Sequence, residues 1–503
     1  MSASASKNDS VVASDTASDG FRRLLWVAAQ EGRAADLRVL PRLAVATFGV
    51  HTAADVLPAL HVAACNDHAA VVLALLGTGP AGVDDQTDAC PPPLWAASFH
   101  GSTDAARVLV QAKADIDNTS TFQGTTSAFV AARGGQTDLL RVLVHAKADI
   151  DRGRTDDGAT PAFMAAHNGH AESLQVLVNA KADIDKARTY CGETPAFMAV
   201  QNGHTDSLRV LVHAKANIDQ VCTYDGATPA FMAAHNGHTE LLRVLVHAKA
   251  DINKARTYDG KTPAYRAAQN GHIDSLRVLV HAKADIEKAR TDCGTTPAFV
   301  AAERGHTDSL QVLVHAKADI DKARADNGAT PALIAAEDGH TDSLQVLVHA
   351  KADIDKAMTT NGATPALMAA QNGHTDSLQV LVHAKADFDK ARTDNGATPA
   401  LMAAQFGRTD SLQVLVHAKA DIDKARTDIG ATPAFMAAEN GHTDSLQALV
   451  NAKADIDKAR TDNGATPAAM AAENGHTARL CTLCCPLRKD RAAHCAKTVR
   501  KQQ

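Results

Sequence analysis

Histidine is the residue type whose spacing most resembles a metal-binding pattern. Imidazole nitrogen is a common zinc ligand, and this 503-residue chain holds 24 histidines. Many fall in two series with a 34-residue step: His170, His204, His238, His272, His306, His340 and His374, and His213, His247, His281 and His315. Members of one series would lie about 10 Å apart in successive layers of packed helices, whereas ligands lie about 2 Å from their metal. The spacing therefore indicates a structural repeat, and we predict no metal and no cofactor.

A second group of metal-ligating side chains lies near the C-terminus. It consists of Cys481, Cys484, Cys485, His494 and Cys495. Together they could supply four soft ligands for zinc. Two other interpretations stay open: a degenerate capping helix with free thiols, and S-acylation of Cys484 and Cys485 beside a basic tail.

Catalytic motifs are absent from the sequence. It contains no G-x-S-x-G, no phosphate-binding Walker loop and no H-E-x-x-H. Its many Asp and His residues recur at one period, whereas an active site needs different groups that converge once. We predict that the protein is not an enzyme.

Glycine gives the period most clearly. A glycine stands before each T-P-A tripeptide, and consecutive glycines are 34 residues apart: Gly158, Gly192, Gly226, Gly260, Gly294, Gly328, Gly362, Gly396, Gly430 and Gly464. Pairs of alanines extend a looser copy of this period to Ala28 and Ala29. Self-similarity at a fixed period of this length is typical of a solenoid.

One unit, from Gly362 to Asn395, predicts two helices and a returning loop. Thr364 is a suitable N-cap, and Pro365 suits the first helical position. Gly373 would end this helix, and Thr375 could cap the second one.

Apolar residues in the same unit predict how the helices pack. Leu378, Val380, Leu381 and Val382 form the stripe of the second helix. The small side chains of the alanine pair, here 369–370, would let neighbouring first helices approach closely. No unit can bury its apolar face alone, so units must stack.

The pattern G-x-T-P-A-x-x-A-A-x-x-G-H-x-x-x-L-x-x-L-V-x-x-x-A-D resembles the ankyrin repeat. The resemblance implies a mainly α solenoid of about fourteen helix-turn-helix repeats joined by β-hairpin-like loops, in which the first histidine series marks a turn. Three features depart from the family pattern. The unit has 34 residues instead of about 33. An apolar residue replaces the usual histidine after T-P-L, as at Phe163, Phe197 and Leu367. Lysine replaces the glycine that ends the second helix, as at Lys181, Lys249 and Lys385, where a positive φ is often needed.

Composition and patterning predict four segments. These are a disordered polar leader (1–20), divergent ankyrin-like repeats (21–123), a regular array with a C-terminal capping repeat (124–485) and a basic tail (486–503). The net charge of −6 gives no general attraction to nucleic acid. Without a signal peptide pattern or a membrane span, we expect a monomeric cytoplasmic protein, with the nucleus as an alternative.

The resemblance also implies where a partner would bind, since ankyrin proteins use hairpin tips and the exposed side of the first helix. The units differ most at those positions. Tyrosine occupies one hairpin-tip position in three successive units, at Tyr190, Tyr224 and Tyr258. Exposed tyrosines are common in binding hot spots. The remaining candidate partner-binding residues are Glu193, Lys261, His167, Gln201 and His235.

We therefore predict a non-catalytic scaffold that binds a protein partner through the concave face of the array. Alternatively, the tyrosines descend from recent duplication, and the array is a spacer rod without a specific ligand. A third possibility is an adaptor that is tethered through its cysteine-rich, basic C-terminal tail.

Overall fold

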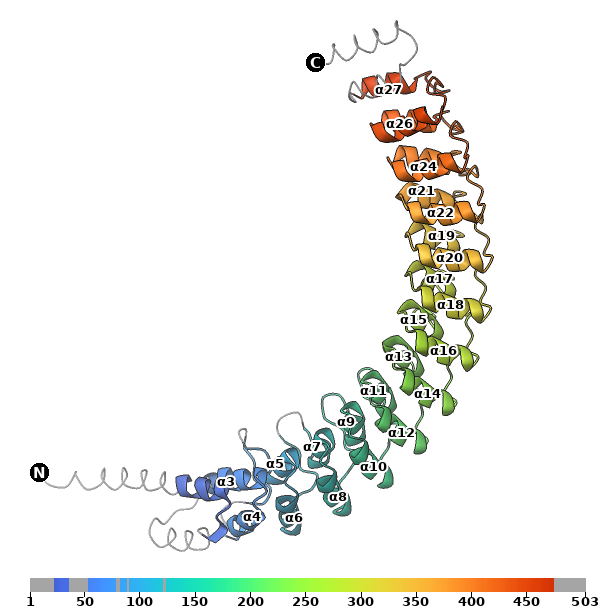
Figure 1. Cartoon of the computed structure of the whole chain (residues 1–503). Coiled ribbons are helices and arrows are strands. Elements are labelled where there is room, and N and C mark those ends of the chain that lie inside the picture. The colour runs from blue at the N-terminus through green and yellow to red at the C-terminus, as the bar shows by residue number, and fades with distance from the viewer. Residues whose placement is uncertain (1–21, 36–52, 78–81, 88–89, 121–123, 475–503) are drawn as a thin grey trace, which may run out of the picture. The chain divides into compact units, whose positions relative to one another are not determined.

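The computed structural model describes residues 22–35, 53–77, 82–87, 90–120 and 124–474 (Figure 1). The described residues form helices and turns and contain no strand. The predicted mainly α solenoid of helix pairs is confirmed. The cysteine-rich group and the basic tail lie outside the described residues.

Helices alternate between the first and the second helix of each repeat. The first helices are α3 (Ala53–Cys65), α5 (Pro93–His100), α7 (Ser127–Gly134), α9 (Pro161–His167), α11 (Pro195–Gln201), α13 (Pro229–Asn236), α15 (Pro263–Gln269), α17 (Pro297–Glu303), α19 (Pro331–Glu337), α21 (Pro365–Asn372), α23 (Pro399–Gln405), α25 (Pro433–Glu439) and α27 (Pro467–Glu473). The second helices are α4 (Ala69–Leu76), α6 (Thr103–Gln111), α8 (Thr137–His145), α10 (Ala171–Asn179), α12 (Thr205–His213), α14 (Thr239–His247), α16 (Ile273–His281), α18 (Thr307–His315), α20 (Thr341–His349), α22 (Thr375–His383), α24 (Thr409–His417) and α26 (Thr443–Asn451).

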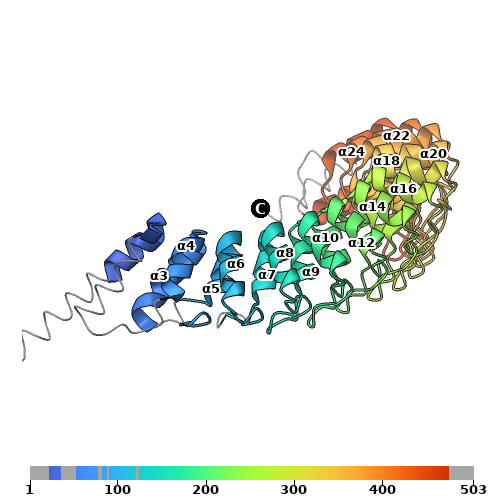
Figure 2. The ribbon, with the colours of Figure 1, turned by 90° about the horizontal axis from the view of Figure 1, so that it is seen from below.

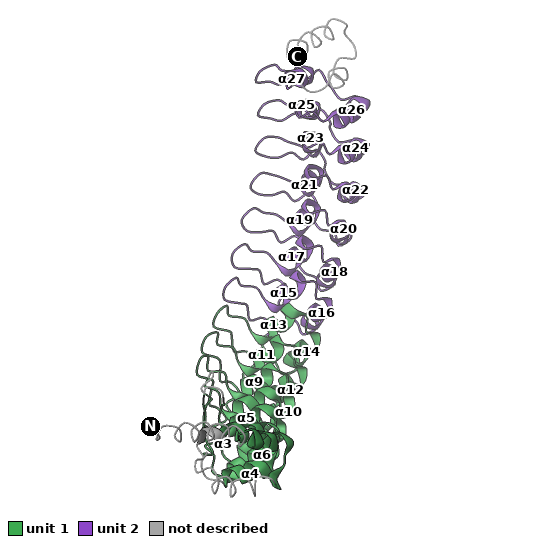
Figure 3. Cartoon of the chain, turned by 90° about the vertical axis from the view of Figure 1, so that its left-hand side faces the viewer, with its two compact units in different colours: residues 1–251 green, residues 252–503 purple. Residues whose placement is uncertain are grey.

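The chain divides into two compact units (Figure 3). Unit 1 is Met1–Asp251 and unit 2 is Ile252–Gln503. Within each unit, a first helix packs on the next first helix and a second helix on the next second helix, as α5, α7 and α9 do in unit 1 (Figure 2).

The ends of the first helix follow the sequence signals. Thr364 Oγ1 accepts a hydrogen bond from Leu367 N at 3.2 Å, and Pro365 occupies the first turn of α21. Gly373 ends the helix with φ of 83°, which a residue with a Cβ adopts only at a cost. All three predictions for this helix are confirmed.

The second helix differs from the prediction at its start. Thr375 is its first residue, and the N-cap position belongs to His374, whose side chain makes no capping hydrogen bond. The predicted Thr375 cap is therefore wrong. The reason is geometric: the chain leaves Gly373 in a tight turn, and the amide of Thr375 bonds back to the Gly373 carbonyl at 3.0 Å.

Lysine ends the second helices in a left-handed conformation. Lys385 has φ of 62°, and the following amide, Ala386 N, donates to Leu381 O at 3.1 Å, as in a Schellman motif. The same conformation recurs with φ between 61° and 68° at Lys113, Lys147, Lys181, Lys215, Lys249, Lys283, Lys317, Lys351, Lys385, Lys419 and Lys453. The backbone thus keeps the geometry expected of a glycine.

The repeat interface combines alanines, leucines and one buried hydroxyl pair. Ala369 and Ala370 of α21 are fully buried, and so are Leu378 and Leu381 of α22. Ser377 is also fully buried, which the repeat pattern did not predict. Its Oγ lies 3.0 Å from Thr341 Oγ1 of the preceding repeat, and equivalent pairs recur along the second helices. These hydrogen bonds satisfy polar groups that would otherwise be costly to bury.

The loop between repeats is a tight hairpin without strands. Arg392 N donates to Ala397 O at 2.9 Å, and Gly396 N donates to Arg392 O at 3.0 Å. Thr393 N donates to Asn361 O of the preceding hairpin at 2.9 Å. Neighbouring hairpins are therefore held to one another, and each tip has a fixed position relative to the next within a unit.

Candidate functional site

Most hairpins carry an ion pair across the tip. We call the position two residues after the hairpin arginine the tip position. In unit 2, Arg392 donates to the tip residue Asp394 through Nε at 3.0 Å and Nη2 at 2.6 Å. Similar pairs join Arg324 to Asp326, Arg426 to Asp428 and Arg460 to Asp462. This ion pair holds the tip residue against its own hairpin.

Tyrosine replaces the tip aspartate in three repeats. Tyr190 and Tyr224 belong to unit 1, and Tyr258 belongs to unit 2. We call these three residues the tip tyrosines. Each has 82% of its surface exposed, the largest fraction among the exposed large hydrophobic residues that the structure describes. In unit 1 the two tips adjoin, because Thr223 N donates to Cys191 O at 2.8 Å.

The hairpin arginine is paired differently in each tyrosine repeat. Arg188 contacts Asp157 of the preceding hairpin at 3.0 Å and Glu193 of its own repeat at 3.1 Å. Arg256 makes a two-pronged pair with Asp259, with Nε–Oδ1 at 3.1 Å and Nη2–Oδ2 at 2.8 Å.

In the repeat of Tyr224, Cys222 stands in place of the arginine and no ion pair is needed. Arg188 and Arg256 thus have carboxylate partners without a tip aspartate, although Arg154 pairs with Asp157, at the repeat position of Asp259, in addition to its tip residue Asp156.

Two of the predicted partner-binding residues are engaged in these ion pairs. Glu193 has only 16% of its side chain exposed and holds Arg188. Lys261 has 11% exposed, and its Nζ lies 3.1 Å from Asp259 Oδ2. The structure therefore places both beneath the tips, where they support the hairpin, and leaves the tyrosines as the outermost groups.

The other three predicted residues lie at the ends of first helices in unit 1. His167, Gln201 and His235 are all half-buried, on α9, α11 and α13. The His167 ring stacks on Phe163 with centroids 6.3 Å apart. Burial lowers the pKa of His167, and the charges of His204 and Arg188 lower it further, so the ring favours its neutral form.

The first histidine series joins neighbouring repeats. His340 Nε2 lies 3.1 Å from Glu303 O, and His442 Nε2 lies 3.0 Å from Gln405 O. Arg408 takes the histidine position once and donates from Nε to Gln371 O at 3.2 Å. Among the described residues, no three His, Cys, Asp or Glu side chains are grouped so that they could hold a metal ion.

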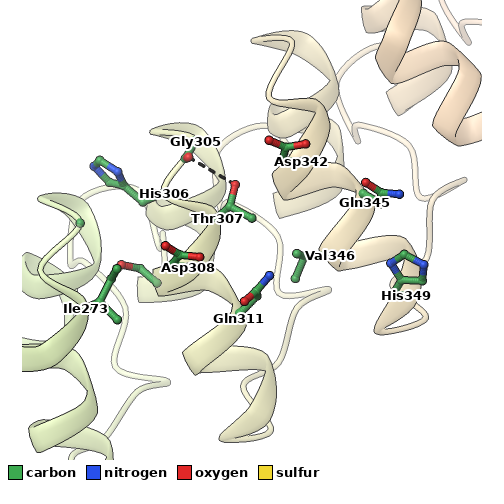
Figure 4. Close-up of a pocket in the computed structure, with 12 residues that line it drawn as sticks. Ile273, Gly305, His306, Thr307, Asp308, Gln311, Asp342, Gln345, Val346 and His349 are labelled. Carbon is green, nitrogen blue, oxygen red and sulfur yellow. Dashed lines mark hydrogen bonds between the residues drawn. The ribbon is translucent and has the colours of Figure 1, made fainter.

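A hollow of about 710 Å³ lies on the opposite, second-helix side of unit 2 (Figure 4). Residues of α16, α18 and α20 line it, among them Asp308, Gln311, Gln345 and His349. Apart from Ile273, these are residue types that recur at the same positions in several other regular repeats. The hollow is a product of the repeat and has no distinctive chemistry.

Comparison with models of known protein families identifies the family of this chain. A model described as ankyrin repeats (3 copies) matches residues 60–153, 128–222, 197–290, 284–358 and 350–428. A second model, ankyrin repeats (many copies), matches residues 434–483.

The chain belongs to the ankyrin repeat family. The residues that depart from the ankyrin pattern therefore leave the backbone of the repeat unchanged. The lysines with positive φ occupy the position at which the family pattern has glycine. No curated protein matches this ankyrin chain in sequence. Within the described ranges, no helix has both the length and the apolar character that crossing a membrane requires.

Proposed function

We propose that this ankyrin protein is a non-catalytic scaffold that binds a protein partner through its hairpin tips and the adjoining ends of its first helices. The observation that carries the proposal is the exposure of the three tip tyrosines. A large aromatic ring with a polar hydroxyl offers much contact area and loses little conformational entropy on binding. Residues of this type often dominate the energy of protein interfaces.

The ion pairs of the tyrosine repeats are compatible with the loss of the tip aspartate. Replacing the tip aspartate alone would leave a hairpin arginine without its carboxylate. Instead, Glu193 and Asp259 supply carboxylates at two hairpins, and Cys222 removes the arginine at the third. Within unit 1, the hydrogen bond from Thr223 N to Cys191 O holds the tips of Tyr190 and Tyr224 in place, so this part of the surface is preorganised and little ordering entropy is lost on binding.

The test is a pull-down from cell extract with two variants of the full chain. In the first, Tyr190→Ala, Tyr224→Ala and Tyr258→Ala are combined. In the control, Asp326→Ala, Asp394→Ala and Asp428→Ala change the same tip position in three other repeats. Both variants are chosen to have the thermal stability of the wild type.

We expect the wild type and the aspartate control to capture the same partner protein. The tyrosine variant should capture at least ten-fold less of that partner than the wild type. Loss of several hot-spot aromatics commonly costs this much or more. Equal capture by all three proteins would refute a role for the tip tyrosines. Capture of nothing by the wild type would refute the scaffold function in that cell type and favour a spacer role.

A further inference from the structure

Two cysteines lie in the neighbouring hairpins that carry Tyr190 and Tyr224. Cys191 follows Tyr190 in its hairpin tip, and Cys222 stands at the arginine position of the next hairpin. Both are free thiols in the structure. We propose that Cys191 and Cys222 are a modification site at which hydrogen peroxide forms a disulfide between the two hairpins. The inference goes beyond the proposed function, because this bond can form whether or not a partner is bound.

The backbone brings the two hairpins together at the cysteines. Thr223 N donates to Cys191 O at 2.8 Å, and Cys222 is the residue directly before Thr223. A hydrogen bond of this kind places the Cα atoms of the paired residues about 5.5 Å apart. A disulfide spans about 4.4–6.8 Å between two Cα atoms. The spacing of the two hairpins therefore suits a disulfide.

The side chains of both cysteines lie on the inner side of the hairpins. A Cβ at Gly192 would be 2.5 Å from Thr223 Cγ2, so the Thr223 side chain lies against Gly192. Cys191 and Cys222 are each one residue away from these two, and successive side chains of an extended segment alternate between its faces. Cys222 belongs to a hydrophobic cluster that includes Phe197, and Cys191 packs against the same cluster.

The preceding repeat shows that side chains at these two positions can reach each other. Asp157 holds the position of Cys191, and Arg188 holds the position of Cys222. Arg188 Nε lies 3.0 Å from Asp157 Oδ2, which joins two neighbouring hairpins. One repeat later, two uncharged thiols replace this ion pair. Elsewhere in the regular array no cysteine is followed by a second cysteine at the matching position, since Cys293 has an arginine there.

The two thiols differ in their access to solvent. Cys191 is half-buried, whereas Cys222 is only 6% exposed. Burial raises the pKa of the Cys222 thiol, against the effect of hydrogen bonds from the Tyr224 and Asp225 amides. The thiolate is the reactive form of cysteine, and its reaction with an oxidant requires access. Cys191 is therefore the thiol that meets peroxide first, and Cys222 is the resolving thiol.

The reaction takes two steps. The Cys191 thiolate attacks one oxygen of hydrogen peroxide, the O–O bond breaks, and the second oxygen leaves as water with the proton of the thiol and one from the peroxide. The Cys222 sulfur then attacks the resulting sulfenic sulfur, the S–O bond breaks, and a second molecule of water leaves. Overall, two thiols lose two electrons and two protons, and hydrogen peroxide is reduced to two molecules of water.

The disulfide would close a covalent loop around one repeat. Helices α11 and α12 lie between Cys191 and Cys222. A disulfide restricts the unfolded chain, so oxidation should slow the local opening of these two helices. It would also fix the tip of Tyr190 to the tip of Tyr224.

The test treats the full chain with hydrogen peroxide, blocks the remaining thiols with N-ethylmaleimide and digests the protein with trypsin without a reductant. Cleavage after Lys and Arg places Cys191 alone in peptide 189–209 and Cys222 alone in peptide 216–243. Mass spectrometry detects the joined peptides by a mass that is two hydrogen atoms below their sum. Hydrogen exchange on the same samples measures the protection of the α11 and α12 amides.

Two variants each remove one thiol and introduce a residue type that the repeat already accepts. Cys191→Asn introduces the residue that Asn327 provides at the same repeat position. Cys222→Met introduces the residue that Met358 provides at its position. Both variants are therefore compatible with the fold.

Cys293 provides a matched control. It holds the same repeat position as Cys191, and Ala325 N donates to Cys293 O at 3.0 Å, but Arg324 stands where a second cysteine would be needed. The control variant Cys293→Asn removes this thiol and leaves Cys191 and Cys222 in place.

We expect the joined peptides in the peroxide-treated wild type and in the Cys293→Asn control, and their separation by dithiothreitol. They should be at least ten-fold more abundant than any joined pair that contains Cys293. Amides of α11 and α12 should exchange more slowly after peroxide treatment of the wild type, and at an unchanged rate in Cys191→Asn and Cys222→Met.

The proposal would be overturned if Cys191 and Cys222 stay separately blocked after peroxide treatment, or if Cys293 joins other cysteines as often as Cys191 joins Cys222. Oxidation of Cys191 to sulfinic acid in the wild type, with Cys222 unchanged, would overturn it too. If the disulfide forms but the tip tyrosine variant captures as much partner as the wild type, the scaffold function through these tyrosines fails and this inference stands.

Discussion

At the scale of single residues, the lysines that end the second helices show how the repeat tolerates an unfavourable conformation. A residue with a Cβ pays about 1–2 kcal/mol in the left-handed region. Lys385 accepts this cost because the hydrogen bonds around it fix the turn from both sides. The positive φ at this position does not require a lysine side chain.

Replacing Lys385 by Gly should therefore stabilise its repeat by about 1 kcal/mol, after the greater freedom of glycine in the unfolded chain is subtracted. Protection of the α22 amides in hydrogen exchange measures this local gain. The matched variant Lys385→Ala keeps a Cβ and should show no gain. If Ala and Gly behave alike, strain at this position is not what limits stability.

At the scale of elements, aspartates in the loops connect one repeat to the next. Asp389 Oδ1 accepts from Asp421 N of the following repeat at 2.7 Å, and Lys424 Nζ donates to Asp389 O at 2.7 Å. Asn253 and Glu287 occupy the same position in other repeats and accept the equivalent bond at 2.8 Å. The position requires an acceptor, not a charge.

Asp389→Asn should accordingly leave stability unchanged within about 0.5 kcal/mol, whereas Asp389→Ala should cost about 1 kcal/mol by removing the acceptor. The difference is measured from urea unfolding of the two variants. Equal loss in both would show that the negative charge, and not the hydrogen bond, supports the junction.

Elements were predicted well from the sequence wherever a signal was local. Thr364, Pro365 and Gly373 define α21 because each acts on its own backbone within a few residues. Thr375 misled the prediction, since the tight turn after Gly373 places it inside the helix.

The candidate site was predictable only in part. The exposure of Tyr190 could be predicted from its place at a hairpin tip. The ion-pair partner of Arg188 could not be predicted from the sequence. That partner includes Asp157, a residue of the preceding hairpin, so the pairing depends on how repeats stack. For the same reason, the sequence did not indicate that Glu193 would hold Arg188, and its contact with a partner stays a prediction.

At the scale of the whole molecule, stacking of like units makes stability a sum of neighbour interfaces. In unit 2, α21 packs between α19 and α23 through the same residue types on both sides. Removing one repeat would bring together two surfaces that already fit a repeat of this sequence.

Deleting the 34 residues from Gly362 to Asn395 should therefore give a folded chain with unchanged helix content per residue, as circular dichroism measures it. Deleting only Gly362–Leu378 removes α21 and part of α22 and leaves a second helix without its pair. That shorter deletion should lower the melting temperature or cause aggregation. A folded product from both deletions would contradict repeat-by-repeat stacking.

The regular tips also have a statistical consequence for recognition. A ligand that contacts the Arg392–Asp394 tip would find the same arrangement at Arg426–Asp428 and Arg460–Asp462. It would bind in several equivalent places, with an affinity raised by their number but with no defined position along the chain. A ligand that contacts Tyr258 and Arg266 together has one place only, because no other repeat combines the two. The uniform repeats thus lengthen the array, and the irregular repeats determine where along the chain a ligand binds.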